Sequence, residues 1–388
     1  MVTREITSHL LQLAKKYPVI TITGPRQSGK TTLVRDVFKA KTYINMESLD
    51  NREFASADPR GFLKKIPDGA VLDEIQRVPE LLSYIQGIVD EKRQNGMFIL
   101  TGSQQFEIQN SISQSLAGRT ALLKLLPFSI TEVKENYGFS SINDLIYQSF
   151  YPRIYDQNLD PTQALGDYFE TYVERDLRQL VQIKNLSQFQ KFVRMCAGRV
   201  GQILNLNSLG NDVGVTHTTA REWLSLLQAS YIVFLLEPFY RNIGKRLVKS
   251  PKLYFYDVGL ASYLLGIESL AHLETHPLRG NLFENLVIAE ILKLRYNQGK
   301  RNNLNFYRDS TGNEIDVIYN IAQYILPIEI KAGETVASDF LKGFNALEKV
   351  IEQYPYGRIV VYGGNREETR HDILITNVPG VLNRLRGM

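Results

Sequence analysis

The sequence has few of the features that mark secreted and membrane proteins. It contains one cysteine, Cys196, so no disulfide can form within the chain. Its longest apolar run, YIVFLL at residues 231–236, is far shorter than the about 20 residues that cross a membrane. Arg4, Glu5 and His9 interrupt the N-terminal stretch, which is not typical of a signal peptide. We therefore expect a cytoplasmic protein with no membrane contact.

Charge of either sign is nearly balanced. Lys and Arg number 45 against 41 Asp and Glu, a formal net charge of +4. This small excess permits a nucleic-acid partner without requiring one, so only local clusters of cations can argue for DNA. The 388 residues are too many for one ordinary core, and a hydrophobic share of 44% is typical of globular proteins. We therefore expect two or three domains.

A phosphate-binding signature follows the first apolar strand. Residues 19–24 (VITITG) read as a strand, and GPRQSGKTT at 24–32 matches the spacing G-x-x-x-x-G-K-[ST] before a helix. Glycines let backbone N–H groups curl around phosphates, and the helix N-terminus adds its positive dipole end. We expect Lys30 to reach the β- and γ-phosphates of ATP and Thr31 to ligate Mg²⁺. The predicted nucleotide-binding residues of this loop are Gly24, Pro25, Arg26, Gln27, Ser28, Gly29, Lys30, Thr31 and Thr32.

A second, acidic signature ends a buried strand. Residues 69–75 (GAVLDEI) begin as an apolar run without alternation, which is typical of a central parallel strand covered on both faces. Strands and helices alternate from residue 19 to residue 103, which predicts an α/β fold with polar residues at the carboxyl ends of its strands. Asp73 is placed to hold Mg²⁺, and Glu74 to orient and deprotonate the attacking water.

Two further residues are candidates for sensing the γ-phosphate. Ser103 ends the next strand, MFILTGS at 97–103, although an ordinary polar strand end explains it nearly as well. Arg119 precedes another apolar strand and has two interpretations, a surface arginine or an arginine finger that acts on the ATP of a neighbouring subunit. The second interpretation predicts a homo-oligomer, because hydrolysis would then depend on assembly.

Longer motifs extend over nearly the whole chain. GPRQSGKTTL, VLDEIQRVPEL, ILTGSQQF and LAGRTALLKLLPFSITE are followed by YVERDL, KRLVKSPKLYFYDVGLASYLLG and GNLFENLVIAEI. Together they resemble a family of prokaryotic AAA+-type ATPases with a second, poorly characterised C-terminal region. The resemblance implies a restriction-endonuclease-like fold, of the PD-(D/E)XK type, in that region. SFYPRIY at residues 149–155 departs from the family, which tends to be richer in glycine before the proline.

The middle of the chain, residues 208–236, has the pattern of a helix-turn-helix unit. Ser208 is expected to cap a first helix, Gly214 to form the turn and Thr216 to cap a second helix. The apolar side of the second helix is Ala220, Trp223, Leu224 and Leu227. A cationic stretch at 241–252, which ends at Lys252, would form a wing that contacts phosphates. The candidate DNA contacts are Thr218, Thr219, Arg221, Arg241, Lys245, Arg246 and Lys249. A packing module without DNA contact is the alternative.

The C-terminal region carries the residue types of a metal-dependent nuclease. Residues 325–335 (ILPIEIKAGET) place Glu329 and Lys331 on one face of a strand that we expect to be buried on its other face only. Asp316 upstream completes the D…E-x-K spacing of the restriction-endonuclease-like fold. Asp316 and Glu329 would share Mg²⁺, Lys331 would stabilise the transition state, and Glu284 would be a further metal ligand. A solvated charge pair, or a fold kept for docking without cleavage, are the alternatives.

These observations predict an α/β protein of three parts. They are a P-loop AAA+-type ATPase domain at residues 1–165, a helical and winged-helix-like region at 166–255, and a restriction-endonuclease-like domain at 256–388. The predicted function is a Mg²⁺-dependent ATPase that couples ATP binding and hydrolysis to the remodelling of DNA, or to metal-dependent DNA cleavage as a deoxyribonuclease. The alternative is a nucleotide-dependent switch or scaffold that binds a protein partner, with a catalytically silent nuclease-like domain.

Overall fold

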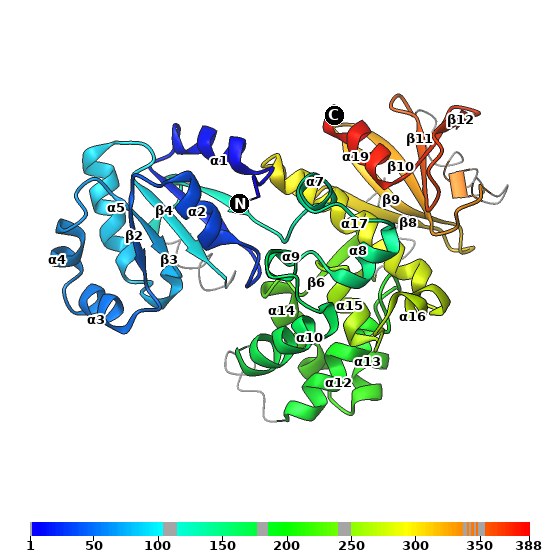
Figure 1. The fold of residues 1–388 in the computed structure, drawn as a ribbon, viewed down its shortest axis with the longest axis horizontal. Helices are drawn as coiled ribbons and strands as arrows, with labels where there is room; N and C mark the ends of the chain where they lie inside the picture. The colour runs from blue at the N-terminus through cyan, green and yellow to red at the C-terminus, as the bar shows by residue number, and fades with distance from the viewer. Residues whose placement is uncertain are drawn as a thin grey trace. The chain divides into compact units, whose positions relative to one another are not determined.

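The computed structural model describes residues 2–103, 115–176, 185–239, 250–336, 340, 343–344, 347 and 354–388 (Figure 1). They belong to two units. Unit 1 comprises Met1–Phe128, Ala229–Tyr231 and Arg295–Lys300, and unit 2 comprises Ser129–Gln228, Ile232–Leu294 and Arg301–Met388. None of the helices among the described residues is both long and apolar enough to cross a membrane.

Unit 1 is built on a parallel five-stranded sheet in the order β2-β3-β4-β1-β5. Its strands are β1 (Val19–Thr23), β2 (Thr42–Asn45), β3 (Ala70–Asp73), β4 (Phe98–Gly102) and β5 (Thr120–Lys124). Every residue of β1, β3 and β4 is buried, and for β3 this is what its unbroken apolar run predicts. The segments that follow β1, β3 and β4 leave the sheet at the same edge, so the α/β prediction is confirmed here and brings the predicted nucleotide residues together.

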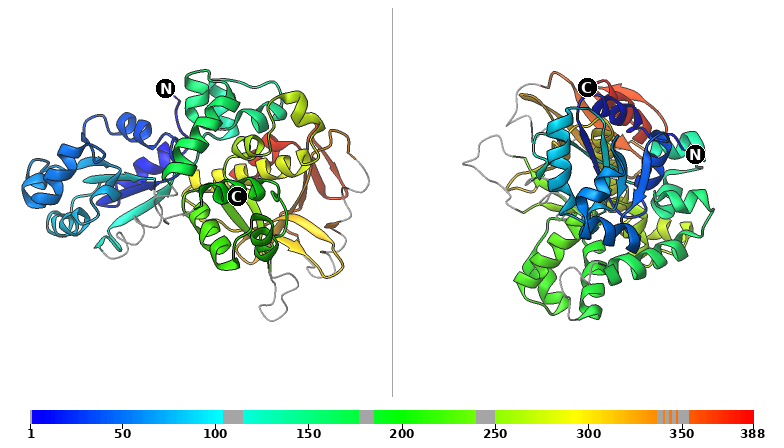
Figure 2. Two further views of the ribbon diagram at one scale, coloured as in Figure 1. Left: turned by 90° about the horizontal axis from the view of Figure 1, so that it is seen from below. Right: turned by 90° about the vertical axis from the view of Figure 1, so that its left-hand side faces the viewer.

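Helices cover both faces of this sheet (Figures 1 and 2). They are α1 (Thr7–Ala14), α2 (Lys30–Val37), α3 (Leu49–Ala57), α4 (Pro59–Lys64) and α5 (Leu81–Lys92). Leu10 of α1 and Leu33 of α2 pack on one face. Ala55, Phe62 and Ile85 of the other three helices pack on the opposite face. Because a fully buried Leu, Ile or Phe side chain contributes about 1.5–3 kcal/mol, these two layers hold the sheet rigid beneath the loops at its edge.

The described residues in the first half of unit 2 are mostly helical. Its helices are α7 (Ile130–Asn136), α8 (Ile142–Gln148), α9 (Pro152–Asp156), α10 (Pro161–Tyr168), the π-helix η2 (Phe169–Asp176), α12 (Leu186–Ala197), α13 (Leu206–Val213) and α14 (His217–Ala229). Ser149 lies in the segment that departs from the glycine-rich family pattern, and its φ is +78°. Side chains other than glycine rarely adopt this conformation, which explains why glycine suits that segment.

The turn between α13 and α14 has the predicted local geometry. Gly214 ends α13 with a φ of +81°, and the Thr216 hydroxyl accepts the N–H of Thr219 at 3.1 Å, which caps α14. The prediction that Ser208 caps the first helix is wrong. Asn205 caps it instead, because its side chain accepts the N–H of Ser208 at 3.0 Å and the helix begins two residues before Ser208.

The second half of unit 2 is a mixed eight-stranded sheet in the order β12-β13-β11-β10-β9-β8-β6-β7. The strands are β6 (Val233–Pro238), β7 (Lys252–Phe255), β8 (Leu304–Arg308), β9 (Glu314–Ile321), β10 (Tyr324–Lys331), β11 (Arg358–Tyr362), β12 (Glu368–Arg370) and β13 (Ile373–Thr376). The helices are α15 (Val258–Leu264), α16 (Leu270–Thr275), α17 (Arg279–Asn297) and α19 (Val378–Arg386), of which α19 lies against β11 (Figure 1). β8, β9 and β10 are antiparallel neighbours, and β11 pairs with β10 in parallel. The sequence LKGFNALEKVIEQY at residues 341–354 predicts a further helix, and most of these residues lie outside the described part of the chain.

Strand β10 is buried on both faces, so the prediction that one face is open is wrong. Glu329 is only 3% exposed, and its apolar neighbours Ile328 and Ile330 are buried as well. The segment at Gly343 covers the charged face so closely that a Cβ atom there would lie 2.0 Å from Glu329 Oε1. The Glu329 carboxylate is therefore not solvated, whereas its partner Lys331 is half-buried.

A side chain pairs with the last residue of β7, Phe255, on the outer edge of this sheet. Asn285 of α17 is 0% exposed, accepts the N–H of Phe255 at 2.7 Å and donates to the carbonyl oxygen of Phe255 at 2.9 Å. The amide thereby takes the part that a neighbouring strand takes elsewhere in a sheet. This pairing satisfies the buried N–H and carbonyl groups of Phe255, while the backbone of Gly201 and Gln202 bonds Leu253 farther along the same edge.

We expect Asn285→Leu to lower the free energy of unfolding by about 3 kcal/mol, because it leaves two buried backbone groups unpaired. Urea unfolding followed by circular dichroism measures this loss. Asn383→Leu, at an exposed position of α19, is the matched control and should change stability little. Equal stability of the two variants would contradict the role given to Asn285.

Candidate functional site

The loop between β1 and α2 has the backbone geometry that phosphate binding needs. Gly29 has a φ of +90° where it begins α2, a conformation that favours glycine. A Cβ atom at Gly24 would lie 2.0 Å from the carbonyl oxygen of Leu125, so only glycine fits there. The loop positions Pro25, Arg26 and Gln27 follow Gly24, and Thr32 lies in the first turn of α2.

Lys30 is buried inside this loop. Its ammonium group donates to the carbonyl oxygens of Gly24 at 3.0 Å and Pro25 at 2.8 Å. Burial lowers the pKa of Lys30 to about 8, although the nearby carboxylates of Glu74 and Asp73 raise it in part. A phosphate group in the loop would favour the charged form of this side chain.

The loop is anchored by a residue that sequence reasoning missed. Arg4, which is buried, donates to the carbonyl oxygen of Ser28 at 2.7 Å and to that of Leu126 at 2.7 Å. The hydroxyl of Ser28 is buried without a hydrogen-bond partner among the described residues, which leaves a donor inside the loop. No sequence signal links Arg4 to this loop, because the contacts join residues far apart in the chain.

Asp73, at the end of β3, accepts hydrogen bonds from three hydroxyl groups. One carboxylate oxygen accepts from Thr31 at 2.7 Å and from Tyr43 at 2.6 Å, and the other accepts from Thr101. A hydroxyl and a carboxylate are the oxygen ligands that Mg²⁺ prefers, so Thr31 and Asp73 fit the predicted metal role. Tyr43 and Thr101 were missed, since their part depends on the order of β2, β3 and β4 in the sheet.

Glu74 follows Asp73 in a strained conformation. Its φ is +57° at the start of the 3₁₀ helix η1 (Ile75–Arg77), a cost that residues other than glycine bear mainly at functional positions. Its Oε2 atom accepts from Gln76 and, at 3.2 Å, from the hydroxyl of Ser103. Ser103 therefore lies where it orients Glu74, and its predicted contact with the γ-phosphate stays a prediction.

Arg119 lies at the amino ends of the strands, whereas the phosphate loop follows the carboxyl end of β1. It precedes β5, whose first residue is level with Val19 at the amino end of β1. Its guanidinium group forms a two-point ion pair with Asp90, at 2.6 and 2.8 Å, which holds the pKa of Asp90 below its usual value. Within its own chain Arg119 is therefore a structural ion-pair residue, and a role on a neighbouring subunit stays a prediction.

In unit 2, the predicted nuclease residues come together. Asp316 of β9 accepts the N–H of Ile330 of β10 at 2.7 Å. The ammonium group of Lys331 lies 2.8 Å from Glu329 and 3.9 Å from Asp316. Burial raises the pKa of Glu329, and the nearby Asp316 raises it further.

Lys252 is part of the same cluster, so its predicted place among exposed wing cations is wrong. It is 3% exposed, and its Nζ atom lies 3.0 Å from Glu284 and 4.0 Å from Asp316. It also forms an ion pair with Glu314, which the sequence analysis did not single out. Burial and the charge of Asp316 raise the pKa of Glu284 to about 7, and Lys252 opposes this rise.

The fit of this cluster to a metal ion is poor. In the part of the chain that the structure describes, no group of three or more Asp, Glu, His or Cys side chains converges closely enough to hold one. The carboxylates of Glu284, Asp316 and Glu329 each lie within 4.0 Å of a lysine ammonium group instead. No chemical step can be assigned to a metal among these residues.

Only some of the predicted DNA contacts can be placed. Thr218 and Arg221 of α14 are exposed, and Thr219 is half-buried beside Thr216. The buried side of the helix is as predicted, with Trp223 edge-on against the rings of Phe189 and Phe192 of α12, both at 5.4 Å between centroids. Outside the described residues lie Arg241, Lys245, Arg246 and Lys249.

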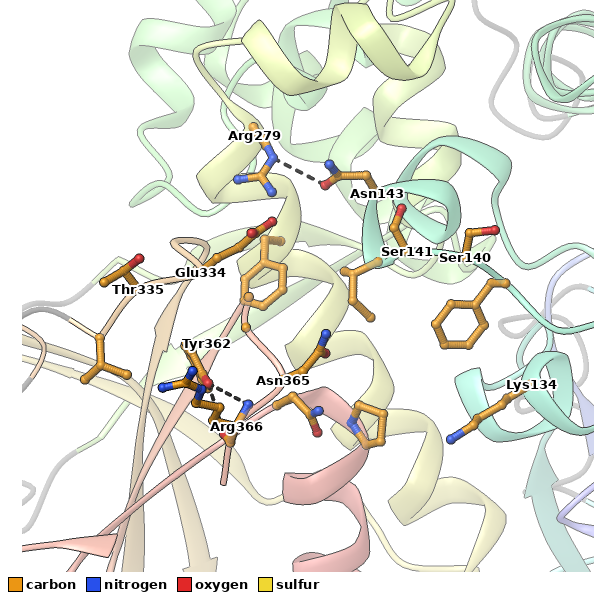
Figure 3. A pocket seen from close by; sticks show the side chains of 18 of the residues that line it. Lys134, Ser140, Ser141, Asn143, Arg279, Glu334, Thr335, Tyr362, Asn365 and Arg366 are labelled. Atoms are coloured by element: carbon orange, nitrogen blue, oxygen red, sulfur yellow. Dashed lines mark hydrogen bonds between the residues drawn. The ribbon is translucent and has the colours of Figure 1, made fainter. Parts of the chain in front are cut away.

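A cavity of about 1050 Å³ lies in unit 2 beside the ends of β10 and β11 (Figure 3). Arg279 crosses one side and donates to Asn143 and to the carbonyl oxygen of Ala332, both at 3.3 Å. The cavity is lined by four cations, Lys134, Arg279, Arg366 and Arg370, and by two acids, Glu334 and Glu368. This excess of positive charge suits an anion, but the lining residues do not include the carboxylate cluster around Lys252.

The lowered pKa of Lys30 predicts how nucleotide affinity depends on pH. Above a pH of about 8 the free protein loses the Lys30 proton, whereas bound phosphate favours the protonated form. Affinity should therefore fall as pH rises through 8, by up to about tenfold per unit. Fluorescence titration with a labelled ATP analogue between pH 7 and 10 measures this. In the Lys30→Arg control the guanidinium stays charged and the fall should disappear; its persistence would contradict the assignment.

Comparison with known proteins agrees with the nucleotide site. Residues 16–134 match the AAA domain family, residues 139–271 match a domain of unknown function (DUF8612), and residues 279–381 match another (DUF4143). Among solved structures, the Walker-type ATPase paby2304 of Pyrococcus abyssi is 16% identical, covers 67% of this chain and 94% of its own, with a TM-score of 0.46. AMPPCP-bound DnaA from Aquifex aeolicus is 15% identical, with coverages of 57% and 85% and a TM-score of 0.30. These scores are too low to carry an argument.

Two relatives match most of the chain. The uncharacterized proteins Rv2008c of Mycobacterium tuberculosis and Mb2031c of Mycobacterium bovis are each 31% identical over 336 residues, which are 86% of this chain and 74% of the relative. The match to the AAA domain and the phosphate loop with its acidic strand end account for the first part of the chain. The protein belongs to the same family as these two mycobacterial proteins, and it begins with a P-loop AAA-type ATPase domain.

Proposed function

We propose that the protein is a Mg²⁺-dependent ATPase that couples ATP binding and hydrolysis to the remodelling of DNA. The observation that supports hydrolysis most is the approach of the Thr31 hydroxyl to the Asp73 carboxylate, at 2.7 Å, at the edge where Lys30 enters the phosphate loop. Mg²⁺ bound by these two residues would neutralise charge on the β- and γ-phosphates. Lys30 would pair with the same phosphates.

Glu74 is the residue we assign to the attacking water. Its carboxylate accepts hydrogen bonds from Gln76 and Ser103, which orient it as the base that takes a proton from the water. It follows directly after the metal residue Asp73, which would place the water in line with the γ-phosphate. Hydrolysis rather than transfer to another acceptor is the reaction that this arrangement favours.

DNA is the partner that the middle region favours. The order α12, α13, α14, β6, β7 and the tight turn at Gly214 support a winged-helix unit. Thr218 and Arg221 are exposed on its second helix, where a recognition helix reads a groove. Contacts of this kind release counterions, so binding should weaken as salt rises.

Metal-dependent cleavage is not part of this proposal. The order α17, β8, β9, β10, β11 supports a restriction-endonuclease-like domain, in which Asp316, Glu329 and Lys331 meet. However, the carboxylates are already paired with the ammonium groups of buried Lys252 and half-buried Lys331. The same observation favours a second candidate function, a nucleotide-dependent switch whose silent C-terminal domain binds a protein partner.

Glu74→Gln should lower the rate of ATP hydrolysis by about 10²- to 10⁴-fold, because the side chain can no longer accept a proton. Nucleotide affinity should change little, since the phosphate loop is intact. Steady-state phosphate release and fluorescent nucleotide binding measure the two effects. Glu80→Gln, at an exposed acid nearby in the sequence, is the control. Less than a tenfold loss of rate would contradict the role of Glu74.

Arg221→Ala should weaken binding to duplex DNA about tenfold at low salt and should reduce the salt slope by about one ion. Fluorescence anisotropy of labelled DNA in a salt series measures both. Lys191→Ala is the matched control, since Lys191 is an exposed cation on the neighbouring helix α12. If the unaltered protein does not bind DNA at low salt, DNA is not its partner, and the switch that binds a protein partner is favoured.

A further inference from the structure

We infer that the ammonium group of Lys252 takes the place of a divalent metal ion in the C-terminal carboxylate cluster, so that this domain is assembled around an internal cation. Three acids from two elements surround it. Its Nζ atom lies 3.0 Å from Glu284 of α17 and 4.0 Å from Asp316 of β9, and it forms an ion pair with Glu314 at the start of β9.

The cation is fixed in this position by its surroundings. Lys252 is the first residue of β7, is 3% exposed and lies 5.6 Å from the centre of the Phe306 ring. The hydroxyl of Tyr254, on the same strand, donates to the oxygen of Glu284 that also contacts Lys252. Because of these contacts, we expect Lys252 to stay in place when a ligand binds, unlike a lysine on the surface.

The remaining carboxylates are also engaged. Glu329 pairs with Lys331 at 2.8 Å, and Lys331 lies 3.9 Å from Asp316. The Asp316 oxygen that faces Lys331, Oδ2, also accepts the N–H of Ile330 at 2.7 Å, and Gly343 packs against Glu329 Oε1. Mg²⁺ requires near-octahedral oxygen ligation, so it would have to expel Lys252 and break several of these contacts.

Two properties follow from an internal cation. The domain should fold and keep its stability without divalent metal, and it should not cleave DNA through a metal-activated water. Removal of the cation should lower the free energy of unfolding, because it leaves buried carboxylates facing one another. A divalent ion could then enter the space and restore what the lysine supplied.

Thermal unfolding of the full chain, without nucleotide, in EDTA and in Mn²⁺ tests this inference. In EDTA, Lys252→Met should lower the midpoint by about 10 °C. Mn²⁺ should recover a large part of that loss, whereas the midpoint of the unaltered protein should not respond. The double variant Lys252→Met/Glu284→Gln carries one buried charge less, so it should be more stable in EDTA than Lys252→Met and should lose the response to Mn²⁺.

A response of the unaltered protein to Mn²⁺ would contradict the inference. If Mn²⁺ stabilises the unaltered protein and Asp316→Asn removes that stabilisation, the cluster binds metal with Lys252 in place and the inference is wrong. Should Lys252→Met fail to fold, this comparison of the unaltered protein with Asp316→Asn decides the question alone. Mn²⁺-dependent nicking of plasmid DNA that is lost in Asp316→Asn would overturn it as well.

Discussion

A carboxylate removed from water is costly unless donors or cations surround it, and both charged centres of this chain are arranged around that constraint. In unit 1 the buried carboxylate of Asp73 is satisfied by neutral hydroxyl groups from Thr31, Tyr43 and Thr101. Because these donors carry no charge, the negative charge of Asp73 remains available for a cation. In unit 2 the carboxylates of Glu284, Glu314, Asp316 and Glu329 are met by the ammonium groups of Lys252 and Lys331. There each carboxylate already faces a cation of the same chain, and Arg308 is a further partner of Glu314.

This difference separates two sites with similar residue types. The ATPase domain keeps the Asp73 carboxylate beside the phosphate loop, where Arg4 anchors the loop and Ser103 orients Glu74. The C-terminal domain places the predicted D…E-x-K residues on two neighbouring strands, yet their carboxylates face lysines of the same chain. The fold alone does not determine the chemistry. Because the carboxylates are paired with lysines, a role in binding or docking is better supported than a role in cleavage. ATP hydrolysis is then the only reaction that we assign to the chain.

The sequence predicted those parts of the sites in which chemistry lies within one short segment. The phosphate loop, the pair Asp73–Glu74 and the D…E-x-K spacing each depend on neighbours along the chain or on one hairpin. Tyr43, Thr101 and Arg4 could not be predicted, since their contacts depend on strand order and on packing between distant segments. Lys252 is the sharpest case. In the sequence it stands among cations with no acid beside it, which suggested a phosphate contact, but the fold brings it to acids more than thirty residues away.

The most direct test of this account is the number of Mn²⁺ ions that the full chain binds, measured by electron paramagnetic resonance with and without a non-hydrolysable ATP analogue. The account predicts one tightly bound ion per chain, which requires the nucleotide, disappears in Asp73→Asn and is unchanged in Asp316→Asn. A nucleotide-independent ion that disappears in Asp316→Asn would contradict the account. It would show that the C-terminal cluster is a metal centre and that Lys252 does not replace the metal.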